Sequence, residues 1–319
     1  MTDPVTAGAL EGRSRGDDVF RGLLTAAAAV LPLLLLFLVW ELWTGAKPAI
    51  DKFGLGFVTS SDWDPVKENY GAAPLVFGTL VSSAIALLIA VPLSLGVAIF
   101  LTEFAPRVVR QPIAFIIGLL AAIPSVVYGL WGIFVLAPIL RAHVFPPLRD
   151  LFGFLPTFQG AIYPTSMLSA SVILAIMVMP YVMSVSREVL MAVPDSQREA
   201  ALAMGATRWE MVTGAVLPYA RSGILGAVIL GLGRALGETM AVTMLIGNRH
   251  EIAASLFSPG YTMAAVIANE FSEAVADMHF AALSYVALAL FVLTVLVNAG
   301  ARLLIWRVAR GSAAGSKAL

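Results

Sequence analysis

The sequence predicts an all-α polytopic membrane protein with six transmembrane helices. The chain is 59% hydrophobic and only 13% charged, whereas soluble domains carry roughly 25% charged residues. Six stretches with few charges are each long enough to cross a bilayer as a helix. Basic residues are unevenly divided between the segments that connect these stretches, which is typical of a membrane protein with one fixed orientation.

Two spans are predicted in the first third of the chain. Residues 22–40 form an apolar stretch that is too long for a typical signal-peptide core, so we expect an uncleaved first span. It follows a polar segment, residues 1–20, that is expected to be a flexible cytoplasmic tail. Residues 45–70 contain glycines and prolines at turn-like positions and are predicted to form a soluble loop. The second span is expected at residues 71–102.

The remaining spans alternate with polar segments inside a membrane domain that covers residues 21–310. Pro124 lies near the middle of the third span, residues 112–140, and predicts a kink there. The apolar piece 151–158 in the next loop is expected to be an interfacial helix. The other predicted elements are the fourth span 164–186, the fifth span 217–248, a mixed loop 249–277, the sixth span 278–301 and a cytoplasmic tail 311–319.

Six spans place both termini on one side, and the positive-inside rule indicates which side. With the N-terminus in the cytoplasm, 13 Lys and Arg residues lie on the cytoplasmic side and 6 lie outside. Arg234 is left within the membrane. The bias predicts that both tails and the segment between the fourth and fifth spans face the cytoplasm. Segments 45–70, 141–163 and 249–277 are then expected outside.

The segment between the fourth and fifth spans carries charged and cap-forming residues between two apolar runs. The run that begins Pro194-Asp195-Ser196 predicts a helix start, and Gly205 predicts the end of that helix. Thr207 is followed three residues later by Glu210, which is the spacing of a capping box. We therefore predict two short helices at 194–218, outside the membrane.

This segment resembles the EAA loop of ABC-importer permeases. In that family the loop is a cytoplasmic coupling helix that sits in a groove of the ATPase subunit. The alternative is an ordinary amphipathic helix at the membrane interface, but a match over twenty residues between two spans favours the coupling helix. Ala215 stands where the family usually has isoleucine. The matching residues are Glu199, Ala200, Ala201, Gly205, Leu217 and Pro218.

Arg234 and Glu238 are ionisable residues within the predicted fifth span. Such residues are costly at membrane depth and usually face the interior of a bundle or a cavity. At a spacing of i and i+4 they would share one face of a helix. Arginine offers a fork of donors that suits phosphate-like oxyanions, so one interpretation is an anion path. A structural ion pair, between helices or between these two residues, explains the spacing equally well.

Ser125 and Tyr128 are further candidates for the lining of such a path. They follow Pro124 in the third span, where a proline leaves a backbone carbonyl without its usual donor. A packed kink is an equally good explanation. Gly233 and Gly237 surround Arg234 with a small-xxx-small spacing, which favours close helix packing first and pore lining second.

The sequence lacks the patterns of several enzyme classes. It contains no Walker A pattern GxxxxGK[ST] and no HExxH pattern. It has no cysteine, which excludes disulfides, thiolate catalysis and cysteine metal sites. We therefore predict no catalytic residue, no metal site and no cofactor bound by this chain. A membrane enzyme or an assembly factor is the competing class, and the EAA-like loop favours a transport permease.

Further motifs resemble the PstC family of phosphate permease subunits, over roughly residues 45–305. The resemblance implies a type I ABC importer (MetI-like) permease fold, and it places Arg234 and Glu238 in the phosphate path. A permease for another oxyanion, molybdate or sulfate, is the alternative. The motifs that carry the resemblance are residues 47–65, Gly78-Thr79-Leu80, IPSVVYGLWG at 123–132, GLGRALGETMAVTMLIGN at 231–248 and residues 262–271.

The same resemblance implies the partners. A chain of this family pairs with a PstA-like second permease subunit in the bacterial inner membrane and contacts membrane lipid. A PstB-like ATPase dimer binds below and uses ATP and Mg²⁺. A PstS-like phosphate-binding protein, periplasmic or lipid-anchored, delivers phosphate from above. We expect no nucleic acid partner, because the formal net charge is +0.

Overall fold

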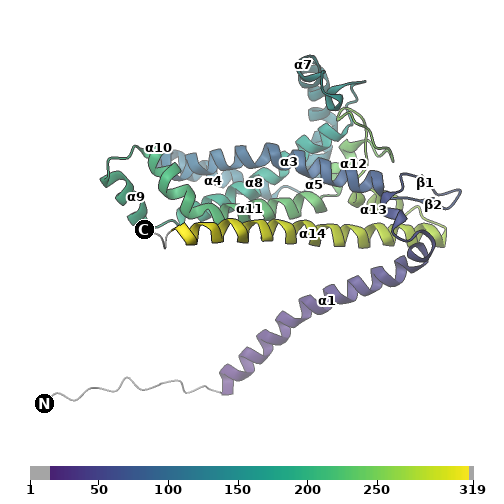
Figure 1. Ribbon diagram of the computed structural model, residues 1–319, viewed down its shortest axis with the longest axis horizontal. Helices are drawn as coiled ribbons and strands as arrows, with labels where there is room; N and C mark the ends of the chain where they lie inside the picture. Colours follow the sequence, from purple (N-terminus) through teal and green to yellow (C-terminus); the bar gives the residue numbers. More distant parts are fainter. Residues whose placement is uncertain (1–14, 316–319) are drawn as a thin grey trace.

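The computed structural model is an elongated bundle of helices (Figure 1). It describes residues 15–315, with side chains described for residues 18–303 and 305. Within this part, 6 helices are long and apolar enough to cross a membrane, so the predicted all-α fold with six spans is confirmed. These helices are Asp18–Phe53, Ala73–Phe104, Ser125–Phe152, Met167–Met191, Arg208–Gly237 and Asp277–Leu303.

Helix α8 (Met167–Met191) lies at the centre of the bundle. In its most apolar window 67% of the residues are buried, against 28% in the crossing that contains α3 (Ala73–Ile99). Both α3 and α11 (Leu217–Gly237) pack on α8. Small residues permit this approach: a Cβ at Gly231 would lie 2.6 Å from Cγ2 of Val182. The absence of a side chain at Gly231 therefore lets α11 pack closely against α8.

The first helix, α1 (Arg15–Phe53), extends beyond the predicted span. Its N-terminal half diverges from the bundle, whereas its C-terminal half packs on α14 (Asp277–Gly315) (Figure 1). Ala46 and Ala49 are fully buried in this contact. The prediction of a soluble loop from residue 45 is therefore wrong at its start, because tertiary packing keeps the chain helical through the turn signal at Pro48.

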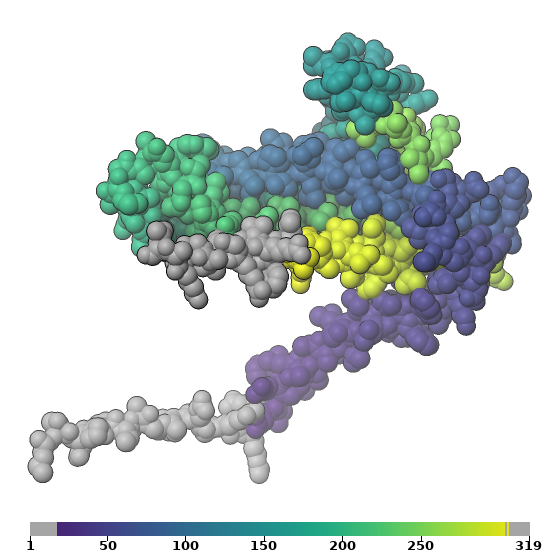
Figure 2. Space-filling view, viewed as in Figure 1, coloured from purple at the N-terminus to yellow at the C-terminus, as the bar shows by residue number. Residues whose placement is uncertain are grey.

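The rest of this segment forms a small cap on one end of the bundle. Helix α2 (Gly56–Thr59) leads into an antiparallel hairpin of β1 (Trp63–Asp64) and β2 (Asn69–Tyr70). We call this end the hairpin end. The short helices α9 (Asp195–Ala203) and α10 (Arg208–Met211) lie at the opposite end, which we call the α9 end (Figures 1 and 2).

The span predicted at residues 112–140 is divided between two helices, and the third long apolar helix, Ser125–Phe152, begins after the division. Helix α4 (Arg107–Ala122) ends before Ile123 and Pro124, which have extended backbones with ψ of 129° and 142°, and α5 (Ser125–Trp131) follows directly. A proline disfavours the helical conformation in the residue before it and has no N–H to donate to the preceding turn. The continuous span predicted at residues 112–140 is therefore wrong: the chain leaves the helix at Pro124, and the third crossing begins at Ser125.

Beyond α5 the chain stays helical as far as residue 152. The prediction of a loop that begins at residue 141 is therefore wrong at its start, and the interfacial helix predicted at 151–158 is replaced by the end of α7 and a separate 3-10 turn. Prolines inside this stretch are accommodated rather than helix-ending. The elements are η2 (Gly132–Leu136), α6 (Ala137–Ile139), η3 (Leu140–Val144), α7 (Phe145–Phe152) and η4 (Pro156–Phe158).

The fifth predicted span is also divided. Helix α11 ends at Gly237, Glu238 has an extended backbone (φ −72°, ψ 127°), and α12 (Met240–Ile246) begins two residues later. The continuous span predicted at residues 217–248 is therefore wrong at Glu238. Helices α5 and α12, which follow the two breaks, pack against each other (Figure 1). The loop after α12 contains a further short helix, α13 (Met263–Glu270).

In the described part of the chain, each of four π-helical turns precedes a proline by two residues. The residue just before the proline donates its N–H to the carbonyl five residues earlier, as Leu217 does to Val212. At Pro138, Pro146 and Pro218, where the helix continues, this wider turn leaves room for the proline ring, which would clash with a carbonyl in a regular α-helix. At Pro106 the helix ends instead. The pairs are η1 (Phe100–Phe104) with Pro106, η2 with Pro138, η3 with Pro146 and η5 (Val212–Val216) with Pro218.

The two predicted tails overlap the ends of the described helices. Helix α1 begins at Arg15, inside the predicted tail 1–20, and α14 continues to Gly315, inside the predicted tail 311–319. Residues 1–14 and 316–319 of these tails lie outside the described residues.

Candidate functional site

The two short helices at the α9 end have the local geometry predicted from their sequence. The Thr207 hydroxyl accepts a hydrogen bond from the Glu210 N–H (3.3 Å), and the Glu210 carboxylate accepts one from the Thr207 N–H (2.8 Å). These bonds form the predicted capping box and lower the pKa of the Glu210 carboxyl. Gly205, between the helices, has φ +88°, a conformation that side chains other than glycine rarely adopt.

Several large apolar side chains are exposed on this segment. Leu202 is 45% exposed, Met204 84% and Trp209 61%. Large apolar side chains gathered on an exposed segment mark a surface that another protein or a membrane covers. Of the residues that resemble the EAA motif, Ala201 is buried and Leu217 half-buried; the exposed ones are Glu199, Ala200, Gly205 and Pro218.

Arg234 lies on α11, within the membrane-spanning region, without a carboxylate partner. Its guanidinium carbon is 4.0 Å from the centre of the Tyr181 ring on α8. Its Nε has no hydrogen-bond partner, and among the described residues no ion pair joins it to any acid. An aromatic face offsets a cation only in part. The half-buried charge of Arg234 is therefore balanced by no acid among the described residues.

Glu238 lies at the break between α11 and α12. Its Oε1 accepts a long hydrogen bond from the Ala241 N–H (3.4 Å), so the carboxylate caps α12. The shared helix face predicted for Arg234 and Glu238 is not formed, because the helix ends between them. Both side chains are half-buried. The structure thus separates the two roles: one residue keeps an unpaired charge and the other closes a helix end.

Tyr128 forms a hydrogen bond across the other break, the one at Pro124 between α4 and α5. Its hydroxyl donates to the Leu120 carbonyl (2.8 Å), and the Tyr181 hydroxyl donates to the Ala121 carbonyl (2.9 Å). These carbonyls belong to the last turn of α4, where the Leu120 carbonyl also accepts a hydrogen bond from the Ile123 N–H (3.3 Å). Tyr128 is buried, whereas Ser125 is half-buried at the start of α5. The same Tyr181 thus contacts Arg234 and the broken end of α4.

Two glycines let α5 approach α12. A Cβ at Gly129 would lie 2.6 Å from Sδ of Met244, and one at Gly132 would lie 2.7 Å from Cδ1 of Leu245. The glycines in the stretch IPSVVYGLWG are therefore needed for the contact between the two helices that follow the breaks.

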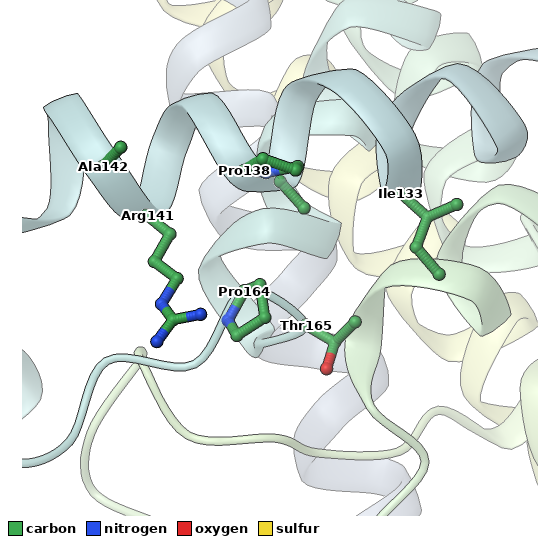
Figure 3. Close-up of a pocket in the computed structure, with 7 residues that line it drawn as sticks. Ile133, Pro138, Arg141, Ala142, Pro164 and Thr165 are labelled. Carbon is green, nitrogen blue, oxygen red and sulfur yellow. The ribbon is translucent and has the colours of Figure 1, made fainter.

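A separate cavity of about 540 Å³ lies between the third crossing and the start of α8 (Figure 3). Arg141 supplies the charged side chain among its lining residues and extends toward Pro164. None of the residues predicted for the substrate path lines it. The lining residues are Ile133, Ala137, Pro138, Arg141, Ala142, Pro164 and Thr165.

A cluster at the hairpin end was not predicted. The Glu270 carboxylate accepts a hydrogen bond from the Trp63 indole N–H (3.0 Å) and lies 3.1 Å from Nε2 of His279 and 3.4 Å from Nε2 of His250. The Trp63 and His250 rings are stacked with their centres 5.0 Å apart. Burial lowers the pKa of His250 to about 4. No short-range pattern links these residues, because 207 positions separate Trp63 from Glu270.

Comparisons with known proteins agree with this architecture. Residues 90–310 match the family described as binding-protein-dependent transport system inner membrane component. The chain is 46% identical over 296 residues to the phosphate transport system permease protein PstC of Mesorhizobium japonicum, covering 92% of this chain and 90% of the relative. It is 41% identical over 315 residues to the phosphate transport system permease protein PstC 2 of Mycobacterium tuberculosis, covering 95% and 97%.

Solved structures share the fold at low identity. A bacterial alginate ABC transporter in complex with alginate pentasaccharide-bound periplasmic protein aligns with a TM-score of 0.60 and 18% identity, over 91% of this chain and 96% of that chain. The MetNI methionine ABC transporter in an inward-facing conformation aligns with a TM-score of 0.53 and 17% identity, over 73% and 94%. The predicted ABC importer (MetI-like) permease fold is thereby confirmed.

Proposed function

Because this chain belongs to the binding-protein-dependent transport permeases, and within them to the PstC family, we propose that it is the membrane-spanning subunit of an ATP-driven importer of inorganic phosphate. The relatives that are 41–46% identical are named phosphate transport permeases. The chain has no ATPase motif of its own, so ATP and Mg²⁺ would be used by a partner.

One observation carries the proposal within the molecule: the charge of Arg234 has no acid beside it. An ionisable residue at membrane depth is retained where it serves a pathway, and its partner is normally close by. Here the guanidinium carbon lies 4.0 Å from the centre of the Tyr181 ring, and no described ion pair includes Arg234. A planar guanidinium binds two oxygens of a phosphate at once. Arg234 would thus attract phosphate to the middle of the crossing.

Glu238 would contribute selectivity rather than attraction. Phosphate still carries a proton at neutral pH, and that hydroxyl can donate a hydrogen bond to a carboxylate. Sulfate and molybdate carry no such proton and would meet only repulsion, which costs several kcal/mol where water is scarce. Ser125, which is half-buried at the start of α5, and Tyr128 are the further candidates for the lining of the path.

The α9 end would receive the ATPase. Exposed Leu202, Met204 and Trp209 supply an apolar docking surface. Glu199, Ala200, Ala201, Gly205, Leu217 and Pro218 form its EAA-like frame. ATP binding by a PstB-like dimer would close that dimer, pull this surface and turn the permease outward.

The remaining partners and the orientation follow from the same proposal. A PstA-like subunit would complete the pore, and a PstS-like binding protein would deliver phosphate at the hairpin end. The α9 end and both termini would lie in the cytoplasm of a bacterial cell and the hairpin end outside its inner membrane, as the 13-to-6 division of basic residues favours.

Uptake of radiolabelled phosphate by reconstituted complexes tests the proposal. The chain is purified with the second permease subunit and ATPase encoded beside it, placed in liposomes and supplied with the binding protein and ATP. Arg234→Ala should reduce phosphate uptake by at least about tenfold, the effect of losing roughly 1.4 kcal/mol, while the ATPase stays bound. Tyr181→Phe keeps the aromatic face and is the matched control. Preferred uptake of sulfate or molybdate by the unmodified complex would overturn the choice of substrate.

A further inference from the structure

Arg198 of α9 is the point at which three elements of the α9 end meet. Its guanidinium forms a two-point ion pair with Glu103, with Nη2 3.0 Å from Oε1 and Nε 3.3 Å from Oε2. It also donates from Nη1 to the Val193 carbonyl and from Nη2 to the Leu190 carbonyl (2.9 Å). The last contact is 3.2 Å from Nη1 to Oδ1 of Asp195. All five N–H groups of the arginine therefore have a partner.

These contacts join separate parts of the fold. Glu103 lies in η1, which ends the crossing that begins with α3. Leu190 is in the last turn of α8, and Val193 follows the end of that helix. Arg198 itself is on α9. One side chain thus ties α9 to the ends of two membrane crossings.

The ion pair is largely shielded from solvent although it lies at the end of the bundle and both residues are only half-buried. The side chains of Arg198 and Glu103 are 17% and 6% exposed. The hydrogen bonds to Glu103 are the main cause that raises the pKa of Arg198. A buried pair persists only when its remaining polar atoms are bonded, and removal of one partner leaves an uncompensated charge. The pair therefore fixes the relative position of the elements that it joins.

Apart from the contacts of Arg198, little of α9 is buried against the bundle. Ala201 is the one buried residue of α9, and it belongs to a cluster that contains Leu101 and Val212. The α9 end projects beyond the long helices (Figure 2). Besides the short linker from α8 and its contacts with α10 and η5, α9 is joined to the bundle by the Ala201 packing and by the Arg198 network. The Arg198 network bonds the ends of two crossings directly.

We propose that Arg198 is a positioning residue for energy coupling. Together with Glu103 it makes α9 move as one body with the ends of α3 and α8, so that movement of an ATPase docked on α9 is passed to the membrane crossings. The inference rests on the proposed function. Lysine cannot replace Arg198, because a single ammonium does not offer the planar fork that holds Glu103 at two points while it bonds the α8 carbonyls.

The test separates coupling from docking. Complexes with Arg198→Ala, Arg198→Lys, Glu103→Gln and the double change Arg198→Ala/Glu103→Ala are reconstituted, and three quantities are measured: ATPase bound, ATP hydrolysed and phosphate taken up. Arg208→Ala on α10 is the matched control, because Arg208 is exposed and is not part of the Arg198 network. We expect the single changes to lower phosphate taken up per ATP hydrolysed by at least about fivefold, and the double change to be no worse than Arg198→Ala, as for two residues in one interaction.

The possible failures are distinguishable. An unmodified complex without ATP-driven phosphate uptake would contradict the proposed function. Normal uptake per ATP in the Arg198→Lys and Glu103→Gln complexes would overturn the coupling role. So would a loss of uptake that is fully matched by a loss of bound ATPase, because the pair would then only shape the docking surface. If Arg198→Ala does not assemble, the two conservative changes still decide between these outcomes.

Discussion

The backbone carbonyl oxygen of Tyr261 occupies the place that a side chain on Gly78 would need, since a Cβ there would lie 2.0 Å from it. The next residue, Thr79, accepts a hydrogen bond from the Met263 N–H at 3.0 Å. Two short motifs that lie 184 positions apart, around Thr79 and Met263, are thus parts of one contact between α3 and the loop before α13. This contact holds the hairpin end against the bundle.

Gly78→Ala should therefore destabilise the protein by at least about 2 kcal/mol, because a backbone oxygen cannot move aside as a side chain can. Gly96→Ala on the same helix is the control, since a Cβ there meets nothing within 4 Å. Thermal unfolding in detergent should show a lower Tm for Gly78→Ala and an unchanged or higher Tm for Gly96→Ala. Equal Tm values for the two variants would contradict the contact.

Gly205 should tolerate asparagine better than valine. A Cβ at this position meets nothing within 4 Å, so the φ of +88° is the whole obstacle to substitution. For a non-glycine residue this positive φ costs roughly 1–2 kcal/mol of conformational energy, and the cost is smaller for asparagine than for a β-branched residue. Pull-down of the ATPase by the permease should weaken about fivefold or more with Gly205→Val and remain near normal with Gly205→Asn. Identical binding by both variants would remove the role of the turn.

Glu238→Gln should lower discrimination against sulfate more than it lowers phosphate uptake. Glutamine keeps an oxygen that can accept the hydrogen bond from the Ala241 N–H, so the start of α12 is preserved while the negative charge is lost. Competition of sulfate with radiolabelled phosphate in vesicles, in a complex that no longer requires the binding protein, measures this effect. An unchanged phosphate-to-sulfate ratio would leave Glu238 with its capping role alone.

Titration of His250 should lower the free energy of unfolding as the pH falls below neutral. Burial lowers its pKa to about 4 in the folded protein, against about 6.5 in an unfolded chain. As the pH falls from 6.5 towards 4, the unfolded chain binds a proton that the folded protein does not, so stability is present above pH 6.5 and is lost through this window. The loss approaches about 3 kcal/mol.

The Tm gap between the unmodified protein and His250→Gln, measured at pH 7.5 and pH 4.5, tests this sign. At the lower pH the Tm of the unmodified protein should fall relative to the Tm of His250→Gln, because glutamine does not titrate. Nε2 of His250 lies 3.4 Å from the Glu270 carboxylate. If that carboxylate compensates the added charge, the gap will stay constant and the prediction fails.

Cysteine labelling tests the orientation. The chain has no cysteine of its own, so single substitutions give a clean background. In intact cells an impermeant thiol reagent should label Val66→Cys in the hairpin, which is 93% exposed, and should not label Ser196→Cys on α9 until the membrane is opened. Labelling of Ser196→Cys from outside would reverse the topology and the assignment of the ATPase side.

Local signals predicted the parts of this molecule that depend on local chemistry. Apolar length predicted the six crossings, and the spacing of Thr207 and Glu210 predicted their capping box. Pro124 marked the right place in the third predicted span but a larger effect than a kink, because the preceding residue also leaves the helix. Gly237 is a residue that often ends helices, but the apolar residues on both sides of the break at Glu238 predicted one continuous span.

Long-range pairing explains what the sequence did not predict. The helical extension to residue 53 depends on the burial of Ala46 and Ala49 against α14, and Arg198 meets a partner 95 positions away. The residues proposed for the path were recognised from a family resemblance, and the spacing alone suggested the wrong geometry for Arg234 and Glu238. Neither residue carries a sequence signal for its contact with Tyr181 or Ala241.

The π-helical turn η5 sets the angular phase between the two ends of the fifth crossing. A π turn contains one residue more than the α-helical turn that it replaces, and each α-helical residue rotates the chain by about 100°. In an uninterrupted α-helix, Trp209 of α10 and Arg234 of α11 would have a fixed angular separation about the helix axis. The extra residue of the π turn changes that separation by about 100°. The π turn before Pro218 thus sets the direction in which α10 faces at the α9 end, where we propose that the ATPase docks.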